Sequence, residues 1–398
     1  MFNSKLKVAV VFGSRSVEHE VSIVTAMQVF ENINREKYKV IPVYIDKSGR
    51  WFVDEKLEKL ESYRNLKLTD IKAREYFFAA STNVKALVPK SVLKFLSKIS
   101  ADIYFPAVHG TFGEDGTLQG LLEMANVPYT GSGVTGSAVG MDKIIQKSVF
   151  KDAGLPVVKS VWFLKSEWED NKIDIIKNIE KNLNYPVFVK PANLGSSVAI
   201  SKAHGIKELE EAINVASQFD KRVLIEEGKE NIIEINCSVL GNDQLIASVC
   251  EQPLKSENIL SYEDKYMKGG KTKGMAGLSR LVPAPISEEL TEKIQEMSKI
   301  AFRAVGASGV SRIDFLVDPV RNNISNGVNE KNNNVWINEI NTLPGSLAFY
   351  LWEKSGLSFD ELIGKLIELG FERHKEKQKL TFSYDSDLLS KIANGGKN

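Results

Sequence analysis

Four polar side chains on two strand-like stretches could carry out chemistry on a phosphorylated substrate. The stretches SRIDFLV and VWINEIN both read as strands, and a polar loop joins them. Because side chains alternate between the two faces of a strand, Arg312 and Asp314 share one face, as do Glu339 and Asn341. If the strands pair with these faces together, three oxygen ligands suit Mg²⁺ and the guanidinium suits a developing oxyanion or phosphoryl group. A surface hairpin with scattered charges is the alternative, since alternating polar residues are ordinary on half-exposed strands.

A second stretch could fold over phosphates. A strand over Tyr185–Pro191 ends in Lys190, and a small Gly/Ser loop over 193–198 follows it. Backbone N–H groups and hydroxyls in such a loop can hold phosphate oxygens. The lysine precedes the loop, whereas in a Walker P-loop it follows the glycines and opens a helix. A plain hairpin turn is the alternative.

Two further loops are candidates for substrate contact. A strand over Ala101–Val108 runs into a loop that begins at His109 and contains three glycines, which indicates unusual backbone dihedrals. A Gly- and Lys-rich stretch over Met267–Leu278 is long for a compact domain, which is typical of a lid. A structural hydrogen bond for His109 and an ordinary solvated loop for the second stretch are the alternatives.

The elements that must position these residues read as α/β. A strand over Lys7–Phe12, a Gly/Ser loop, a helix over Val17–Ile33 and a strand over Lys39–Ile45 predict the start of a doubly wound domain. A charge-rich stretch over Trp51–Ser100 is interpreted as peripheral and without chemistry. One helix is expected over Ser137–Ala153.

The composition argues against several classes of protein. The chain has 398 residues and a net charge of +1, which gives no case for nucleic acid or a membrane surface as partner. No apolar stretch approaches the roughly 20 residues of a membrane span, and no signal peptide is recognised, so a cytoplasmic protein is expected. The two cysteines, Cys237 and Cys250, are interpreted as buried apolar residues, and the four histidines lack zinc-motif spacing.

Seven motifs in register resemble the D-alanine–D-alanine ligase family of the ATP-grasp superfamily. They lie between Lys7 and about Gly356, and they are Glu18-His19-Glu20-Val21-Ser22, His109-Gly110 with Gly113-Glu114-Asp115-Gly116-Thr117, Met141-Asp142-Lys143, Lys190-Pro191 with Gly195-Ser196-Ser197-Val198, Tyr262-Glu263 with Lys265-Tyr266, Ser311-Arg312-Ile313-Asp314, and Asn338-Glu339-Ile340-Asn341-Thr342 with Pro344-Gly345. The resemblance implies an α/β fold of three domains with ATP between the second and third. The predicted boundaries are 1–131 for an N-terminal doubly wound substrate domain, 132–226 for a central ATP-grasp subdomain, 227–375 for a C-terminal ATP-grasp subdomain with the metal site, and 376–398 for a tail.

The resemblance also implies a reaction. ATP would phosphorylate the carboxylate of one D-alanine, and the amine of a second D-alanine would attack the acyl phosphate to give D-alanyl-D-alanine for peptidoglycan. Two Mg²⁺ ions, with Mn²⁺ as an alternative, would assist, and dimers are usual in the family.

The resemblance assigns a role to each motif residue. Glu20 would hold the ammonium of the first D-alanine together with Ser196 and Tyr266, and His109 would line that subsite. Arg312 and the N–H of Gly345 would stabilise the tetrahedral oxyanion. The remaining assignments are phosphate contacts for Lys143, Lys190, Ser197 and Lys265, adenine and ribose contacts for Glu226 and Glu234, and metal ligation for Asp314, Glu339 and Asn341.

Two departures from the family bear on the acceptor and the ribose. The Ser/Thr-rich run after Gly345 is several residues shorter than usual, so Ser346 is the candidate for the carboxylate of the second D-alanine, in an uncertain register. The segment between Glu226 and Glu234 also differs in length from the family, which affects the ribose assignment.

Functions other than D-alanine–D-alanine ligation are alternatives. Relatives that form a D-lactate ester lack the lysine–tyrosine pair that Lys265-Tyr266 retains, which favours an amine acceptor. A D-alanine–D-lactate or D-alanine–D-serine ligase, another ATP-grasp carboxylate–amine ligase, and a nucleotide-binding protein without catalysis are the alternatives.

Overall fold

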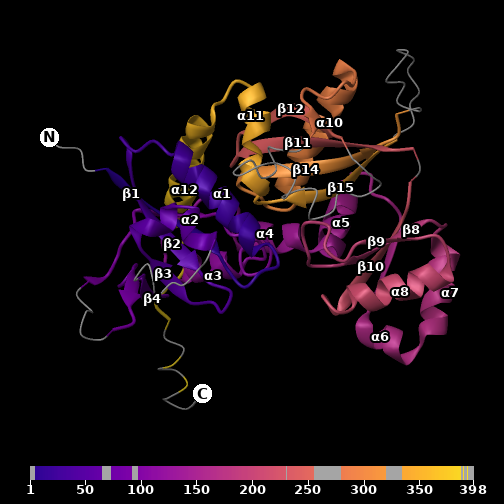
Figure 1. Ribbon diagram of the computed structural model, residues 1–398, viewed down its shortest axis with the longest axis horizontal. Helices are drawn as coiled ribbons and strands as arrows, with labels where there is room; N and C mark the ends of the chain where they lie inside the picture. Colours follow the sequence, from indigo (N-terminus) through magenta and orange to yellow (C-terminus); the bar gives the residue numbers. More distant parts are fainter. Residues whose placement is uncertain are drawn as a thin grey trace.

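Three β-sheets make up the framework of the protein (Figure 1). The computed structural model describes residues 5–64, 73–91, 97–229, 231–254, 279–319, 334–386, 389 and 392. Among these residues, no helix is long and apolar enough to cross a membrane.

The first sheet has six strands in the order β5-β4-β3-β2-β1-β6. Its strands are β1 (Leu6–Gly13), β2 (Tyr38–Ile45), β3 (Trp51–Val53), β4 (Arg74–Phe78), β5 (Leu87–Pro89) and β6 (Ile103–Pro106). β1 pairs in parallel with β2 and β6, as expected of a doubly wound start, whereas β3, β4 and β5 extend the sheet with antiparallel pairs. The interpretation of 51–100 as peripheral was therefore wrong for these three strands.

Helices from both ends of the chain cover this sheet. α1 (His19–Asn32) and α12 (Phe359–Gln378) pack together on the face that presents Val8, Val10 and Phe12. α3 (Thr117–Met124) packs on the opposite face, against Ala9 and Val11. The alternating burial of β1 residues in two cores explains why that strand reads as a continuous apolar run.

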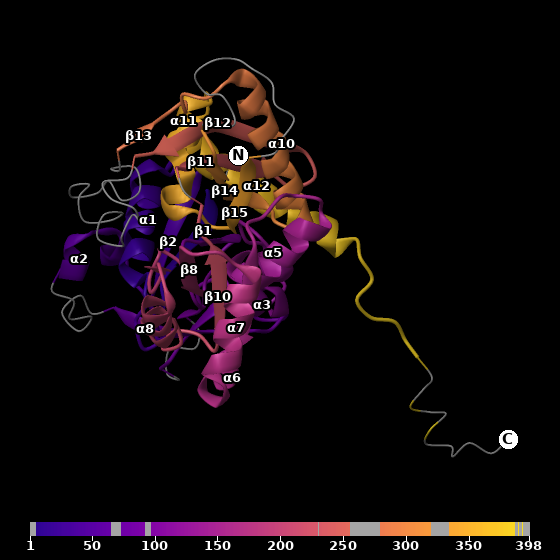
Figure 2. The ribbon, with the colours of Figure 1, turned by 90° about the vertical axis from the view of Figure 1, so that its right-hand side faces the viewer.

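The second sheet has four antiparallel strands in the order β7-β10-β8-β9. Its strands are β7 (Ser160–Leu164), β8 (Val187–Pro191), β9 (Ser201–Ala203) and β10 (Arg222–Glu227). The helices that share its core are α6 (Lys165–Asp170), α7 (Lys172–Asn182) and α8 (Ile206–Ala216). These helices lie together beside the second sheet in Figures 1 and 2.

The third sheet has five antiparallel strands in the order β13-β12-β11-β14-β15. Its strands are β11 (Ile233–Gly241), β12 (Leu245–Pro253), β13 (Arg280–Leu281), β14 (Gly309–Val317) and β15 (Val335–Asn341). α10 (Glu288–Ala304) packs against it, and its core also includes Phe150. α11 (Phe349–Lys354) contacts β12.

The stretch predicted as one helix over Ser137–Ala153 belongs to two helices. α4 (Val134–Met141) and α5 (Lys143–Asp152) meet at Asp142, whose φ of −90° and ψ of 103° end the first helix. The Asp142 carboxylate accepts hydrogen bonds from the N–H groups of Ile144 and Ile145, so it caps the second helix. The prediction of a single helix was therefore wrong, and the break fixes the position of Lys143.

The remaining short elements are the 3₁₀ helices η1 (Glu55–Glu58) and η4 (Gly345–Ala348) and the helix α2 (Glu61–Arg64). Figure 2 shows the chain over 379–386 leading away from the body after α12. The domain boundaries predicted from the sequence remain a prediction.

Candidate active site

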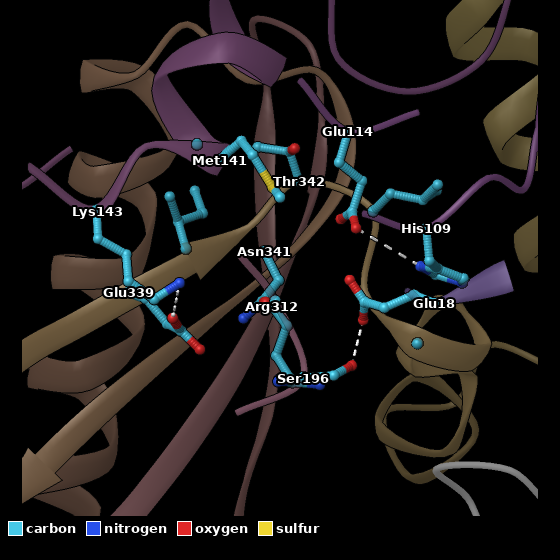
Figure 3. Close-up of a pocket in the computed structure, with 15 residues that line it drawn as sticks. Glu18, His109, Glu114, Met141, Lys143, Ser196, Arg312, Glu339, Asn341 and Thr342 are labelled. Carbon is cyan, nitrogen blue, oxygen red and sulfur yellow. Dashed lines mark hydrogen bonds and ion pairs between the residues drawn. The ribbon is translucent and has the colours of Figure 1, made fainter. Parts of the chain in front are cut away.

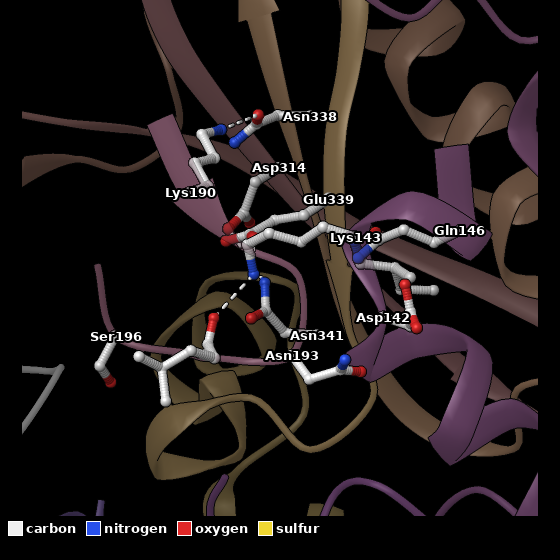
Figure 4. A network of polar contacts seen from close by, with 12 residues as sticks. Asp142, Lys143, Gln146, Lys190, Asn193, Ser196, Asp314, Asn338, Glu339 and Asn341 are labelled. Atoms are coloured by element: carbon white, nitrogen blue, oxygen red, sulfur yellow. Dashed lines mark hydrogen bonds and ion pairs between the residues drawn. The ribbon is translucent and has the colours of Figure 1, made fainter. Parts of the chain in front are cut away.

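The strand pair predicted from the sequence forms, with the predicted faces together. β14 and β15 are antiparallel, with Arg312 opposite Asn341 and Asp314 opposite Glu339. Arg312 donates two hydrogen bonds to the Asp314 carboxylate, from Nε at 2.7 Å and from Nη2 at 2.8 Å. Asn341 Nδ2 donates a third at 3.0 Å (Figure 4). Both strands therefore direct their polar side chains to one place.

A cavity lies between these strands, the first sheet, the α4–α5 junction and the Gly/Ser loop (Figure 3). Its polar lining comes from distant parts of the chain, namely Glu18, His109, Glu114, Lys143, Ser196, Arg312, Glu339, Asn341 and Thr342. Gly140, Met141, Gly195, Ile340, Leu343 and Gly345 complete the wall. The structure thus brings together residues from six of the seven sequence motifs, and the seventh, Tyr262–Tyr266, lies outside the described residues.

Glu18, and not Glu20, faces this cavity. The Ser196 hydroxyl donates a hydrogen bond to Glu18 Oε1 (Figure 3), and Glu18 is 5% exposed. The Glu20 side chain is 59% exposed and pairs instead with Lys47 at 2.6 Å. The placement of Glu20 beside Ser196 was therefore wrong, because α1 begins at His19 and directs Glu20 to the surface.

His109 lies beside Glu18 at the end of the cavity formed by the first sheet. Its Nε2 is 2.8 Å from Thr25 Oγ1, and its Nδ1 is 3.8 Å from Glu114 Oε2. Glu114 also accepts a hydrogen bond from the Gly110 N–H at 2.7 Å. Sequence reasoning placed His109 in a substrate subsite but missed Glu114, although both belong to the same glycine-rich motif.

The turn after β15 contributes a backbone edge to the cavity. Gly345 lines the wall, whereas Ser346 is 2% exposed and does not belong to the lining. The Ser346 N–H donates to Thr25 Oγ1 at 3.3 Å, and residues 346–348 all have φ between 51° and 55°. Three successive non-glycine residues in the left-handed region are strained, which makes this short turn a defined feature of the site.

The Gly/Ser loop also contains left-handed residues. Ser196 and Ser197 have φ values of 55° and 59°. The loop is attached to the second sheet through Asn193, whose backbone N–H and side-chain Nδ2 both donate to Asp220 Oδ2, at 2.7 and 2.9 Å. These contacts hold the loop above the cavity.

Lys143 joins α5 to strand β15. Its Nζ donates to the Leu194 carbonyl at 2.9 Å and pairs with Glu339 at 3.2 Å. Burial alone would lower the pKa of Lys143, but the neighbouring carboxylates, Glu339 first, raise it, so the side chain is cationic.

Lys190 belongs to a buried group of three charges with Glu226 and Lys147. Lys190 Nζ lies 2.5 Å from Glu226 Oε2, and Lys147 Nζ lies 2.8 Å from Glu226 Oε1. Burial alone would raise the pKa of Glu226, but the two lysines lower it to about 2. Because lysines occupy both oxygens, the Glu226 carboxylate is not placed for the adenine contact that the resemblance implied.

Sequence reasoning missed Lys147 altogether. A signal was present, because Lys143, Lys147 and Phe150 follow helical spacing on one face of α5, and all three are buried. A lysine on the apolar face of a helix needs a buried partner.

The carboxylates of β14 and β15 suit a hard cation. Burial raises the pKa of Asp314 to about 6, with Arg312 opposing and Glu234 and Glu339 adding to the increase, so negative groups crowd this point. Two carboxylates and one amide oxygen are a donor set that Mg²⁺ accepts when phosphates and water supply the rest. In the parts of the chain that are described, no group of three or more His, Cys, Asp or Glu could hold a metal ion.

The structure does not test the predicted roles of Lys265, Tyr266 and Glu234 or the predicted lid. Lys265, Tyr266 and the lid predicted over Met267–Leu278 lie outside the described residues, as does most of the loop between β14 and β15. Glu234 lies on β11, half-buried, and its predicted ribose contact remains a prediction. The two cysteines are buried and free, on adjacent strands.

Comparisons with known proteins agree with this geometry. The family described as D-ala D-ala ligase N-terminus matches residues 7–132, and the one described as D-ala D-ala ligase C-terminus matches residues 149–368. A D-alanine--D-alanine ligase from Bacillus cytotoxicus is 39% identical over 387 residues, which cover 96% of this chain and 99% of the relative.

Solved structures are similar over almost the whole chain. The D-alanine-D-alanine ligase from Coxiella burnetii is 31% identical with a TM-score of 0.77, covering 99% of both chains. A D-Ala:D-Ser ligase from Enterococcus faecalis is 34% identical with a TM-score of 0.76, covering 92% of this chain and all of the other. These similarities confirm the α/β ATP-grasp fold that the sequence predicted.

Proposed function

The chain belongs to the D-alanine–D-alanine ligase family, and we propose from its site that it joins two D-alanines in an ATP-dependent reaction that releases ADP and phosphate. The product, D-alanyl-D-alanine, is a peptidoglycan precursor. The observation that carries the proposal is the convergence of Arg312, Lys143 and the Glu18–Ser196 pair on one cavity. Phosphate-binding, oxyanion-stabilising and ammonium-binding groups thus meet in one place.

The first step forms an acyl phosphate. A carboxylate oxygen of the first D-alanine attacks the γ-phosphorus of ATP, the bond to the β,γ-bridging oxygen breaks, and ADP leaves. We assign the ammonium of this D-alanine to Glu18, beside Ser196 and His109, and Tyr266 is proposed to complete that subsite. Lys143, Lys190 and Ser197 are proposed to hold the ATP phosphates, with Lys265 reaching the γ-phosphate. Positioning and charge neutralisation account for catalysis of this kind.

The second step forms the peptide bond. The amine of the second D-alanine attacks the acyl phosphate carbonyl, and the tetrahedral intermediate collapses with release of phosphate and loss of the amine proton. Arg312 and the N–H of Gly345 are proposed to donate to the oxyanion. Ser346 is proposed to bind the acceptor carboxylate, which requires the buried turn after Gly345 to present its hydroxyl to the cavity.

The metal is part of the proposal. Asp314, Glu339 and Asn341 would hold two Mg²⁺ ions or Mn²⁺, which neutralise the phosphate charge when bound. Glu226 and Glu234 keep proposed places near the adenine and ribose, Glu226 through its backbone. A cytoplasmic location, where ATP is available, and a homodimeric state, usual in the family, complete the proposal.

A second candidate is a D-alanine–D-serine ligase, favoured by the similarity to the D-Ala:D-Ser ligase structure. Phosphate release from ATP and Mg²⁺ should be measured with D-alanine, L-alanine, D-alanine plus D-serine, and D-alanine plus D-lactate, with products identified by mass. We expect release with D-alanine alone and the mass of D-alanyl-D-alanine. A predominant D-alanyl-D-serine product from the equimolar mixture would favour the second candidate, and abundant ester product at neutral pH would contradict an amine acceptor.

A further inference from the structure

A buried lysine that the reaction scheme does not use lies next to the proposed phosphate site. Lys147 is on α5, and its side chain is 4% exposed. Its partner Glu226 is 3% exposed and contacts Lys190 through its other oxygen. The three side chains form one line of charges, lysine–glutamate–lysine, which we call the charge triad.

The fold builds this triad from two strands, β8 and β10, and one helix, α5. In the β8–β10 pair, Lys190 is opposite Leu224 and Glu226 is opposite Phe188, so Lys190 and Glu226 are diagonal neighbours on one face of the sheet. α5 packs on the same face, since Ile144 and Leu224 share a small core. Lys147 lies one turn after Ile144, which brings its ammonium to the carboxylate.

The third sheet closes the triad from the other side. The Asn338 side-chain oxygen on β15 lies 3.5 Å from Lys190 Nζ (Figure 4), and the Asn338 carbonyl lies 3.5 Å from Lys147 Nζ. Asn338, the residue before Glu339 on β15, therefore contacts both lysines. The triad lies where the second and third sheets meet.

Charge balance gives Lys147 a purpose beyond packing. A buried carboxylate paired with Lys190 alone would make a neutral pair, and such a pair attracts phosphate weakly. Burial lowers the pKa of Lys147 and Glu226 opposes that effect; with Lys147 protonated, the triad has a net charge of +1 while Glu226 still holds Lys190 in place. The two lysines contact separate oxygens, so neither one displaces the other.

We propose that Lys147 is a positioning residue for the nucleotide: it neutralises Glu226, so that Lys190 is held by Glu226 and keeps its charge for the ATP phosphates. This inference rests on the proposed function only in placing the phosphates at Lys190. Lys147 itself touches neither nucleotide nor reacting atoms. The opposing view is that Lys147 only fills and stabilises the core.

Four variants separate the two views. Lys147→Met removes the charge and keeps the length, which makes the triad neutral. The double variant Lys147→Met/Glu226→Gln returns the triad to +1. Glu226→Gln alone makes it +2. Lys177→Met, an exposed ion-paired lysine on α7, is the matched control.

The readout is nucleotide binding without D-alanine, by calorimetry, for ADP and for adenosine. We expect Lys147→Met to weaken ADP binding about tenfold or more, because a unit charge a few ångströms from phosphate is lost in a buried site. Adenosine affinity should stay within about twofold, since Coulombic attraction acts on the charged phosphates. The double variant should restore ADP affinity to within about threefold of wild type, since its net charge is restored. Lys177→Met should match wild type.

Other outcomes overturn the inference. Equal loss of ADP and adenosine affinity in Lys147→Met means that the residue has a packing role, and so does a double variant as weak as the single one. If Lys147→Met does not fold, Glu226→Gln decides alone: ADP binding tighter than wild type supports the inference, and weaker or equal binding refutes it. Wild-type protein that binds ADP but releases no phosphate with D-alanine contradicts the proposed function and leaves this test intact.

Discussion

Exchanging one carboxylate for an amide at two nearby positions tests which glutamate binds the first D-alanine. Glu18→Gln and Glu20→Gln change charge and leave size almost unaltered. Glu18 is buried in the cavity and accepts a hydrogen bond from Ser196, whereas Glu20 is mostly exposed and paired with Lys47. The two variants should therefore differ greatly, although they are two residues apart.

The expected magnitude follows from the environment of each side chain. A hydrogen bond to a charged group is worth about 1.5 to 3 kcal/mol, so Glu18→Gln should lower kcat/KM for D-alanine by about 10- to 150-fold. The glutamine oxygen can still accept from Ser196, so folding should be preserved. Glu20→Gln breaks an exposed ion pair of the kind that contributes little, and kcat/KM should stay within about twofold of wild type.

The assay is phosphate release over a range of D-alanine concentrations at saturating ATP and Mg²⁺, with thermal unfolding as the control for folding. The KM for ATP should be unchanged in Glu20→Gln, whose carboxylate is at the surface, and should change less than kcat/KM for D-alanine in Glu18→Gln, because the glutamine oxygen can still accept from Ser196 in the phosphate loop. A larger decrease in kcat/KM for Glu20→Gln than for Glu18→Gln would refute the assignment of the ammonium to Glu18. It would also refute the explanation that the start of α1 directs Glu20 away from the cavity.

Three further predictions follow from the same contacts. Arg312→Lys cannot keep both hydrogen bonds to Asp314 and loses an oxyanion donor, so kcat should fall by about 10²- to 10³-fold while calorimetry shows unchanged ADP binding. The two lysines lower the pKa of Glu226 to about 2 despite its burial, so the stabilisation from its charge is complete above pH 4.5 and is lost as the pH falls towards 2. The difference in Tm between wild type and Glu226→Gln should therefore become smaller from pH 4.5 to pH 2. A constant difference in Tm would contradict this prediction. Asp220→Ala removes the acceptor for Asn193 and should raise the KM for ATP by about 2- to 10-fold, with a smaller rise in the KM for D-alanine because Ser196 belongs to the same loop.

The sequence was sufficient to predict the site where the alternation of side chains along a strand determines which residues share a face. The β14–β15 pairing is regular from Arg312 opposite Asn341 to Asp314 opposite Glu339, and the register shifts only after Asp314, so alternation alone placed these four side chains on one face. The sheet extension by β3, β4 and β5 was missed because these strands are short and lie among charged residues, so their apolar pattern is weak.

The sequence could not predict which charged residues far apart in the chain would form ion pairs. Lys147 and Glu226 are 79 positions apart, and nothing in either local pattern names the other. The contact depends on how α5 packs against the second sheet, and Ile144 and Leu224 are part of that packing contact. The helix pattern could show only that a lysine was on the apolar face of α5 and therefore required a partner.

The choice between Glu18 and Glu20 shows how a small error in a helix boundary moves a functional residue. Glu18 has φ −99° and ψ 21°, whereas Glu20 lies in the first helical turn of α1. Their side chains therefore point in different directions, and only Glu18 lines the cavity. A helix expected from Val17 makes Glu20 a plausible inward residue, whereas the observed start at His19 leaves Glu18 at the N-cap position, outside the regular helix. Because helix starts are defined by the sequence only to within one or two residues, the resemblance could supply the motif but not the member of it that meets Ser196.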